Sequence, residues 1–449
     1  MNNQKIKQAS FLSGSVPKAI LHFVWPFMLG IIVQNLYGAI DLFVVGQYAT
    51  TVDVSAVTIG SQLMAIVTQL VIGLATGITV LIGRYFGANK KEELTNTTTA
   101  SIIVFGIIAV FLTLIYLLFH TQMVYLMQTP PEAIQATKEY LFVCSIGILF
   151  IVGYNIITNI LTGLGDSKTP FLFILVACII NIGLDILLVK YFHLGALGAA
   201  IATTIAQAGS FLFSIIYIKW KGLGFPIWNI KLLEWKQQVK KLLKIGTPIS
   251  IQNVLISISF LFITAIINQF GLIASAAVGI VEKLITFLFV PAISLGTVVG
   301  TATSQNYGAN NPARAKEFLW WSIGIALLPS IIIAIFCQFQ GHLLTAILSN
   351  DALAQDLAAN YLKSYIFDIL FVSFVFCFNG YFNSLGKSAF TLFHSLITTF
   401  AVRIPLAYFL SELPNTSLYL IGWAAPISTL ISLLLCLYYL RKIKTETFQ

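Results

Sequence analysis

Residues 98–119 read TTASIIVFGIIAVFLTLIYLLF and contain no charged side chain. A helix of about 20 apolar residues spans the hydrocarbon core of a bilayer, so this stretch predicts a transmembrane helix. Similar apolar runs occur along the whole chain. We expect about twelve spans, at residues 19–45, 54–82, 98–119, 138–162, 170–190, 195–218, 243–268, 277–301, 318–337, 361–383, 389–410 and 419–440.

The composition excludes a soluble protein. The chain has 449 residues, of which 58% are hydrophobic and 9% are Asp, Glu, Lys or Arg. Soluble domains carry about 25% charged residues. The sequence therefore predicts an all-α integral membrane protein.

The basic residues lie mostly on one side of the expected membrane. With the N-terminus inside, 20 of the 25 Lys and Arg residues fall on the cytoplasmic side. Only Lys138, Lys190 and Lys363 fall outside. By the positive-inside rule we expect both termini in the cytoplasm and a multi-pass protein of a prokaryotic inner membrane. The same rule explains the net charge of +9, so we expect no nucleic-acid partner.

The two halves of the chain resemble each other. YFGANKKEEL (85–94) matches NYGANNPARA (306–315), and LTGLGDSKTP (161–170) matches FNSLGKSAFT (382–391), both pairs at the same separation along the chain. Six crossings per half return the chain to the same side, so we expect two parallel six-helix repeats. The N-terminal lobe would comprise residues 1–218 and the C-terminal lobe 243–449, joined by a cytoplasmic linker at 219–242.

Six ionisable residues remain inside the expected spans: Asp41, Asp185, Glu282, Lys283, Asp368 and Arg403. Charged side chains in hydrocarbon are costly and mark pathways or buried pairs. The N-terminal lobe has two acids without a base, and an unpaired buried carboxylate must bind a proton or a cation. The C-terminal lobe has two acids and two bases, so there we expect at least one ion pair that fixes helix contacts.

The depths of the N-terminal acids allow them to meet. At about 1.5 Å per residue, Asp185 and Thr203 lie roughly 10 and 12 Å from the outer ends of their helices, and Asp41 lies near the outer end of its own. Asn181 precedes Asp185 by one turn on the same face. Each polar residue alone is more typical of a bond between helices. Together they predict a cation or proton site.

Further polar residues are candidates for lining a substrate cavity. Gln34 and Tyr37 precede Asp41 on its own helix face. The complete set of candidates is Gln34, Tyr37, Asn155, Glu282 and Asp368.

Signs of catalysis are absent from the sequence. The five histidines are scattered, and the spacing of the five cysteines suggests neither a metal site nor a disulfide framework. We therefore expect a transporter and no enzyme, with no catalytic residues.

The chain resembles the multidrug and toxic compound extrusion (MATE) transporters. The resemblance rests on PFMLGIIVQNLYGAIDLFVVG (26–46), RYFGAN (84–89), TGLGDSKTP (162–170), NIGLDILLV (181–189) and GALGAAIATTIAQ (195–207). It implies antiport: export of lipophilic or cationic organic compounds by alternating access, coupled to inward flow of H⁺ or Na⁺.

Within that family the chain resembles the DinF-like branch. This implies that the coupling proton or cation, including a possible Na⁺, binds Asp41, Asn181, Asp185 and Thr203. The NorM branch has an acid in its seventh helix, where this chain has none; Asp368 matches that branch's second acid. We expect no cofactor besides H⁺ or Na⁺, and a monomer whose partners are the lipid bilayer and a small organic substrate.

A flippase for lipid-linked saccharides, from the same superfamily, is the alternative function. Such a protein would need a cationic cavity to hold pyrophosphate. The unpaired charges here are acidic, which favours the antiporter.

Overall fold

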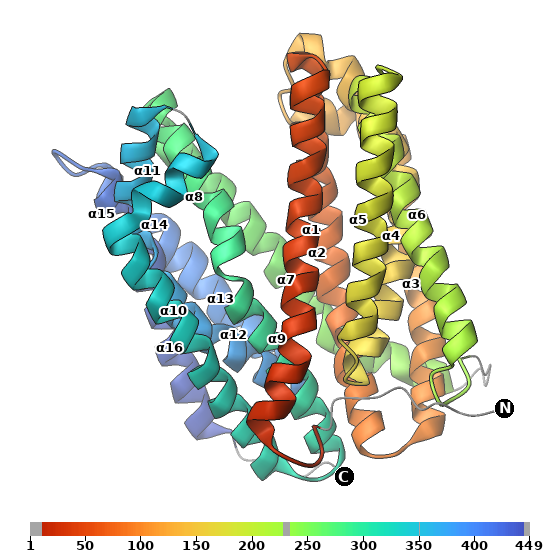
Figure 1. The fold of residues 1–449 in the computed structure, drawn as a ribbon. Helices are drawn as coiled ribbons and strands as arrows, with labels where there is room; N and C mark the ends of the chain where they lie inside the picture. The colour runs from red at the N-terminus through yellow and green to blue at the C-terminus, as the bar shows by residue number, and fades with distance from the viewer. Residues whose placement is uncertain (1–10, 228–233, 350, 444–449) are drawn as a thin grey trace. The chain divides into compact units, whose positions relative to one another are not determined.

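The computed structural model describes residues 11–227, 234–349 and 351–443, and within them every regular element is helical (Figure 1). The first repeat contains α1 (Val16–Tyr48), α2 (Thr51–Gly87), α3 (Lys91–Leu126), η1 (Pro131–Ala133), α4 (Ile134–Gly163), α5 (Lys168–Asp185), η2 (Ile186–Tyr191) and α6 (Gly195–Lys221). The second contains α7 (Glu234–Asn268), α8 (Leu272–Leu288), α9 (Val290–Gly308), α10 (Pro312–Leu348), α11 (Ala352–Tyr365), α12 (Asp368–Ser384), α13 (Ser388–Leu396), η3 (Ile397–Arg403), α14 (Ile404–Ser411), α15 (Leu418–Gly422) and α16 (Ala424–Lys442).

The helices confirm an all-α membrane fold. Ten segments are long and apolar enough to cross a membrane, and there are up to twelve if each of two bent pairs is one span. The bent pairs are α8 with α9, at 41°, and α11 with α12, at 51°. Most helices run beyond the expected apolar stretches, because a helix continues past the hydrocarbon into the polar layers.

The repeated sequence motifs adopt the same backbone conformations. Asn89 and Asn310 end the helices of the two GAN motifs with φ of 55° and 57°. The amide that follows each Asn donates to the carbonyl five residues earlier, at 2.9 and 2.8 Å. Gly165 and Gly386, in the second repeated motif, have φ of 87° and 74°. Asn and Gly tolerate this left-handed region, so both motifs are helix terminators.

Asp53 fixes the start of two helices at once. Its Oδ2 accepts hydrogen bonds from the backbone N and the Oγ1 of Thr50, at 3.1 and 2.7 Å, closing a capping box at α2. Its Oδ1 accepts a hydrogen bond from the backbone N of Ala196 at 2.8 Å. The first turn of α6 is thereby held at the start of α2, which sets the position of Thr203 two turns further along α6.

The chain divides into two compact units. Unit 1 comprises residues 25–246 and unit 2 comprises residues 11–24 with 247–443 of the described chain. The first turns of α1 therefore belong to unit 2, and those of α7 to unit 1. Pro26 and Pro248, which lie inside these two helices, follow the two boundaries closely. The expected linker at 219–242 includes the end of α6 (219–221) and the start of α7 (234–242), and residues 228–233 lie outside the described residues.

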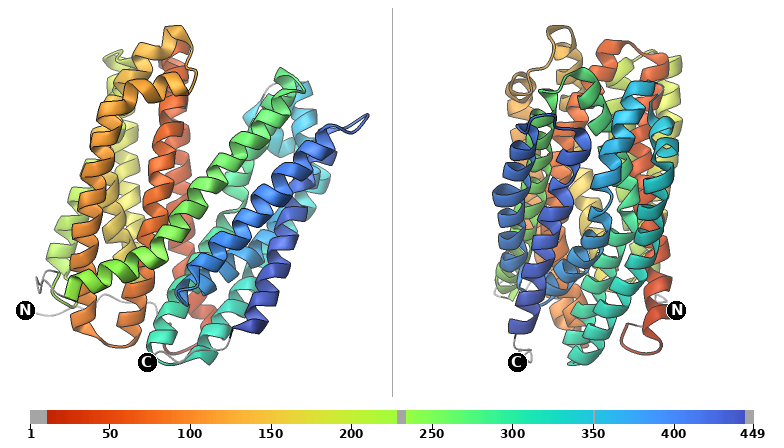
Figure 2. Two further views of the ribbon diagram at one scale, coloured as in Figure 1. Left: turned by 180° about the vertical axis from the view of Figure 1, so that it is seen from behind. Right: turned by 90° about the vertical axis from the view of Figure 1, so that its left-hand side faces the viewer.

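Within unit 1, α4 packs against α2, α3 and α6, while α5 packs against α6 (Figure 2). Within unit 2, α9 packs against α10 and α12, and α11 against α8 and α15. The central position of α4 matters for the site, because its side chains reach the helices on either side.

The start of the described chain is clamped into unit 2. Arg314 donates from Nε to the carbonyl of Phe11 at 2.8 Å, and from Nη2 to the carbonyls of Ser13 and Gly14 at 2.9 Å each. The ring of Phe11 is fully buried and lies 5.4 Å from that of Phe318, edge to face. These contacts hold the N-terminal end of α1 in unit 2.

Candidate functional site

Four residues singled out from the sequence come together inside unit 1. Asp41 projects from α1, Asn181 and Asp185 from α5, and Thr203 from α6. Oγ1 of Thr203 donates to Oδ2 of Asp41 at 3.0 Å, and Nδ2 of Asn181 lies 3.5 Å from Oγ1 of Thr203. Asp185 lies beside Asp41 at a range where the two charges interact strongly. The convergence inferred from helix depth is therefore observed.

The two acids are removed from solvent. Asp185 and Asn181 are 0% exposed and Asp41 is 6% exposed. Two ionised carboxylates side by side in such surroundings repel each other and lose their hydration. The arrangement is stable only if a proton or a cation lies between them.

Several oxygen atoms of the site have no hydrogen-bond donor within the described part of the chain. They are Oδ1 of Asp41, both carboxylate oxygens of Asp185 and Oδ1 of Asn181. Buried polar atoms normally have partners, so four unpartnered acceptors in one place require an explanation. A shared proton or a bound Na⁺ would satisfy them, since hard cations prefer oxygen ligands.

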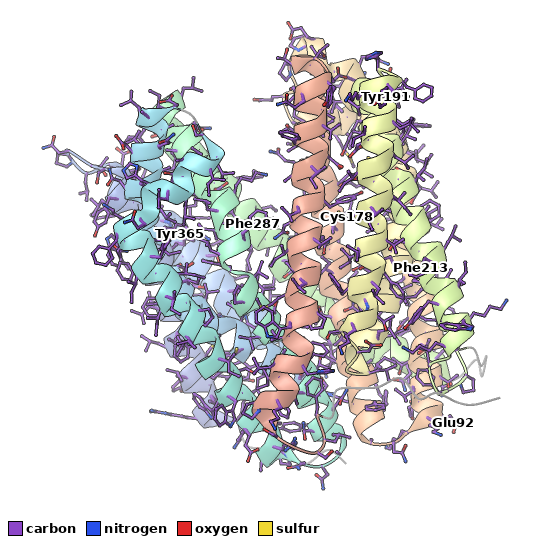
Figure 3. All side chains as sticks on the ribbon, in the orientation of Figure 1. Glu92, Cys178, Tyr191, Phe213, Phe287 and Tyr365 are labelled. Atoms are coloured by element: carbon purple, nitrogen blue, oxygen red, sulfur yellow. The ribbon has the colours of Figure 1, made fainter. Side chains whose placement is uncertain are left out.

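The helix that carries Asp185 changes its winding at that residue. α5 ends at Asp185 and continues as the π-helical turn η2. Such turns shift the register of the backbone hydrogen bonds and are frequent at functional sites. Figure 3 labels Cys178 and Tyr191, which bracket the part of α5 and η2 that carries the site.

Two residues near the carboxylates were not predicted as site residues from the sequence. Tyr140 and Cys144 lie one turn apart on α4, buried, within electrostatic range of Asp41. Their spacing recurs in the second repeat at Tyr361 and Tyr365, in the register of the repeated motifs. This repeated spacing could have pointed to Tyr140 and Cys144, although the spacing alone does not distinguish a functional site from ordinary helix packing.

The five cavity candidates are not gathered in one place within either unit. Tyr37 lies next to Asp41 and Thr203, whereas Gln34 is exposed. Asn155 donates from Nδ2 to the carbonyl of Ile151 at 2.8 Å, so its side chain bonds within α4. Glu282 and Asp368 belong to unit 2.

The ion pair expected in the second repeat is not a direct contact. Among the described residues, no acid lies within 4.0 Å of the charged nitrogens of Arg403 or Lys283. Nη2 of Arg403 instead donates to Oη of Tyr365 at 2.9 Å, and the guanidinium lies 4.7 Å from the ring of Phe260. A pair at longer range stays a prediction, because Glu282 and Asp368 act electrostatically on Arg403 while its guanidinium packs on aromatic rings.

The described residues do not form a metal site built from His, Cys, Asp and Glu side chains. Within the described ranges, no three or more His, Cys, Asp or Glu side chains are grouped to hold a metal ion. All five cysteines are buried and free. A cation at Asp41 and Asp185 would therefore rely on amide and hydroxyl oxygens in addition to the two carboxylates.

Comparison with known proteins identifies the family. The MatE family model matches residues 26–187 and 248–409, once in each repeat. The probable multidrug resistance protein YpnP of Bacillus subtilis is 27% identical over 408 residues, covering 89% of both chains. The multidrug export protein MepA of Staphylococcus aureus is 26% identical over 410 residues, covering 90% of this chain and 89% of MepA.

Solved structures show the same fold. An outward-facing multidrug resistance MATE transporter superposes with a TM-score of 0.90 at 22% identity. A MOP superfamily transporter from Pyrococcus furiosus, described as having a binding pocket of reverse polarity, superposes with a TM-score of 0.91 at 22% identity. Each comparison covers 98% of both chains.

The two family matches begin at Pro26 and Pro248, the prolines that lie early in the two halves of the sequence. They cover well over half of the chain, and the helices around them are those of a multi-span membrane protein. The chain therefore belongs to the MatE family of membrane transporters, and it is not an enzyme.

Proposed function

We propose that this protein is an antiporter that exports lipophilic or cationic organic compounds in exchange for H⁺ or Na⁺. The observation that carries the proposal is the pair of buried carboxylates, Asp41 and Asp185, of which Oδ1 of Asp41 and both oxygens of Asp185 lack donors in the described part of unit 1. The names of YpnP and MepA, as multidrug resistance and export proteins, support the substrate class. Asp41, Asn181, Asp185 and Thr203 match the DinF-like branch, to which we assign the chain.

Coupling follows from competition between two conformations. A proton or Na⁺ bound at Asp41 and Asp185 favours one state of the transporter, and the substrate favours the other. A ligand shifts such an equilibrium only by its differential affinity for the two states. Na⁺ would be held by oxygens of both carboxylates, Asn181 and Thr203, whereas a proton would be shared between the two acids.

The proposed substrate contacts are chosen for their attraction to organic cations. Acidic and aromatic side chains attract organic cations. The proposed substrate contacts are Gln34, Tyr37, Asn155, Glu282 and Asp368. We further propose that the protein acts as a monomer in the lipid bilayer, without a nucleic-acid partner and without any cofactor other than H⁺ or Na⁺.

We propose a prokaryotic inner membrane location with both termini in the cytoplasm. Single cysteines test this, because the native cysteines are buried. Lys90→Cys and Glu132→Cys both introduce a thiol at an exposed position. An impermeant maleimide should label Glu132→Cys in intact cells and Lys90→Cys only in inverted vesicles. The reverse pattern would contradict the proposed orientation.

The flippase alternative needs basic groups that are free to hold pyrophosphate. In unit 2, the half-buried guanidinium of Arg403 already contacts Tyr365 and Phe260. The charged groups at the site of unit 1 are the carboxylates of Asp41 and Asp185, which repel phosphate. The antiporter remains the better-supported function, although proteins of this fold include one with a reversed pocket polarity.

Transport in proteoliposomes tests the antiporter directly. A fluorescent organic cation should move against its gradient when a pH or Na⁺ gradient is imposed, and Asp41→Asn or Asp185→Asn should abolish this movement. Asp356→Asn is the matched control, because this aspartate is 61% exposed and lies outside the site. Full gradient-driven transport by both single variants would refute the proposed site.

A further inference from the structure

Unit 2 contains a polar cluster that corresponds to the site of unit 1. Tyr361 and Tyr365 on α11 follow Tyr140 and Cys144 on α4 at the same separation as the repeated motifs. The α4 pair lies beside Asp41 in unit 1. The α11 pair lies in a cluster of its own in unit 2, where Figure 3 labels Tyr365.

The second cluster lacks the two carboxylates of the first. The starts of the two family matches, Pro26 and Pro248, are 222 residues apart, whereas the repeated motifs are 221 residues apart. At either separation the corresponding residues are apolar: Phe262 or Ile263 for Asp41, and Leu406 or Ala407 for Asp185. Ile263 and Ala407 are 3% and 0% exposed and belong to the apolar core of unit 2. A mobile cation therefore has no equivalent carboxylates to bind at these positions of the second repeat.

Arg403 lies within one position of the residue that corresponds to Asn181, which is Val402 at a separation of 221 and Arg403 at a separation of 222. It is the last residue of the π-helical turn η3. Its guanidinium is held by the 2.9 Å hydrogen bond to Tyr365 and lies 4.7 Å from the centre of the Phe260 ring. A fixed positive charge thus lies in the part of the second repeat that corresponds to the turn of α5 around Asn181.

Two acids from other helices surround this charge. Glu282 on α8 and Asp368 on α12 lie within electrostatic range of Arg403. Asp368 is 4% exposed, and its Oδ1 has no hydrogen-bond partner among the described residues. The exposed Lys283 also acts on Glu282. Arg403 is therefore the basic residue that acts on the charge of Asp368.

We propose that Arg403 is a tethered cation that takes, in the second repeat, the place of the mobile coupling ion of the first. It keeps Glu282 and Asp368 compensated throughout the transport cycle, so this repeat binds no coupling ion. The guanidinium cannot leave and is not deprotonated in proteins. The inference rests on the proposed cation coupling, because it assigns that coupling to unit 1 alone.

Removal of the tethered charge should reveal a latent cation site. Removal of one of two interacting buried charges leaves the other uncompensated, which strongly destabilises the folded protein. In Arg403→Gln, Asp368 would recruit Na⁺ or a proton to replace the guanidinium, whereas Glu282 keeps Lys283 as a neighbouring positive charge. The tyrosines of α11 remain neutral hydroxyls and cannot supply this compensation. Arg403→Lys keeps the charge and is the matched control.

The test is thermal unfolding of the purified full-length protein, which needs no transport. All variants carry Asp41→Asn and Asp185→Asn, so that unit 1 contributes no response to cations. The unfolding midpoint is measured in choline chloride, in sodium chloride of equal ionic strength, and in choline chloride at lowered pH. The variants compared are the parent, Arg403→Gln, Arg403→Lys and Arg403→Gln combined with Asp368→Asn.

We expect Arg403→Gln to lower the midpoint in choline by about 4 °C or more. Na⁺ or lowered pH should restore at least half of this loss. Arg403→Lys and the Arg403→Gln/Asp368→Asn combination should show no response beyond that of the parent. A loss that neither Na⁺ nor acid restores would overturn the inference, as would a response that survives Asp368→Asn.

Failure of this inference is distinguishable from failure of the proposed function. The antiporter proposal fails if Asp41→Asn and Asp185→Asn transport normally under an imposed gradient. The tethered-cation proposal fails on the unfolding midpoints alone, whatever those two variants transport.

Discussion

The hydroxyl of Thr203 donates a 3.0 Å hydrogen bond to Asp41 and so joins α6 to α1 at the buried carboxylates. Asn181 reaches the same hydroxyl from α5, at 3.5 Å. Three helices of unit 1 therefore meet at one oxygen atom. The orientation of Asp41 depends on this contact, because its other oxygen lacks a donor in the described residues.

Thr203→Val should weaken the coupling site while preserving the shape of α6. A hydrogen bond to a charged group contributes about 1.5–3 kcal/mol, which corresponds to a loss of roughly tenfold to a hundredfold in cation affinity. The measurement is the Na⁺ or H⁺ concentration that half-saturates transport in proteoliposomes. Thr203→Ser retains the hydroxyl and should remain close to the parent; equal losses in both variants would assign the effect to packing.

Asp41→Asn and Asp185→Asn should have effects that do not add. If the two acids bind one proton or one cation together, either substitution removes that shared site. The double variant should then transport no worse than each single variant. Gradient-driven efflux and gradient-free binding of the substrate are measured for all three proteins. Independent, multiplicative losses would indicate two separate sites.

Gly60→Ala should disturb Tyr140, and through it the side of the site that faces α4. A Cβ at Gly60 would overlap the ring of Tyr140. Overpacking of this kind costs about 1–3 kcal/mol, and it should lower both the unfolding midpoint and coupled transport. Gly106→Ala is the control, because a Cβ there meets nothing within 4 Å. A Gly60→Ala protein with an unchanged midpoint would show that the Tyr140 ring moves freely.

Arg314→Ala should destabilise unit 2 by releasing the chain at Phe11. The substitution removes three charge-assisted hydrogen bonds to backbone carbonyls, and we expect a loss of about 2–4 kcal/mol. Thermal unfolding of the purified protein measures this loss. Lys316→Ala removes an exposed positive charge on the same helix and should have little effect. If both variants lost equal stability, the clamp would be unimportant.

The spans and the meeting of the acids were predictable, because apolar length and helix rise leave few alternatives. The bends between α8 and α9 and between α11 and α12 were harder to predict from the sequence. Pro291 directly follows the break between α8 and α9 and could have signalled it, whereas the bend after Tyr365 has neither Pro nor Gly at the break. The aromatic contacts of Arg403 could not be predicted either. The sequence shows which charged residues share a lobe, but it does not show which side chains a guanidinium packs against.

The clamp between Arg314 and Phe11 also constrains how the protein is made. The two residues are 303 positions apart in the chain. At about 5–20 residues per second, a ribosome needs roughly 15–60 s to reach Arg314 after it has made Phe11. During that interval the beginning of α1 has no final partner, so unit 2 can close around it only late in synthesis. The nascent protein therefore enters the membrane before its earliest segment has docked.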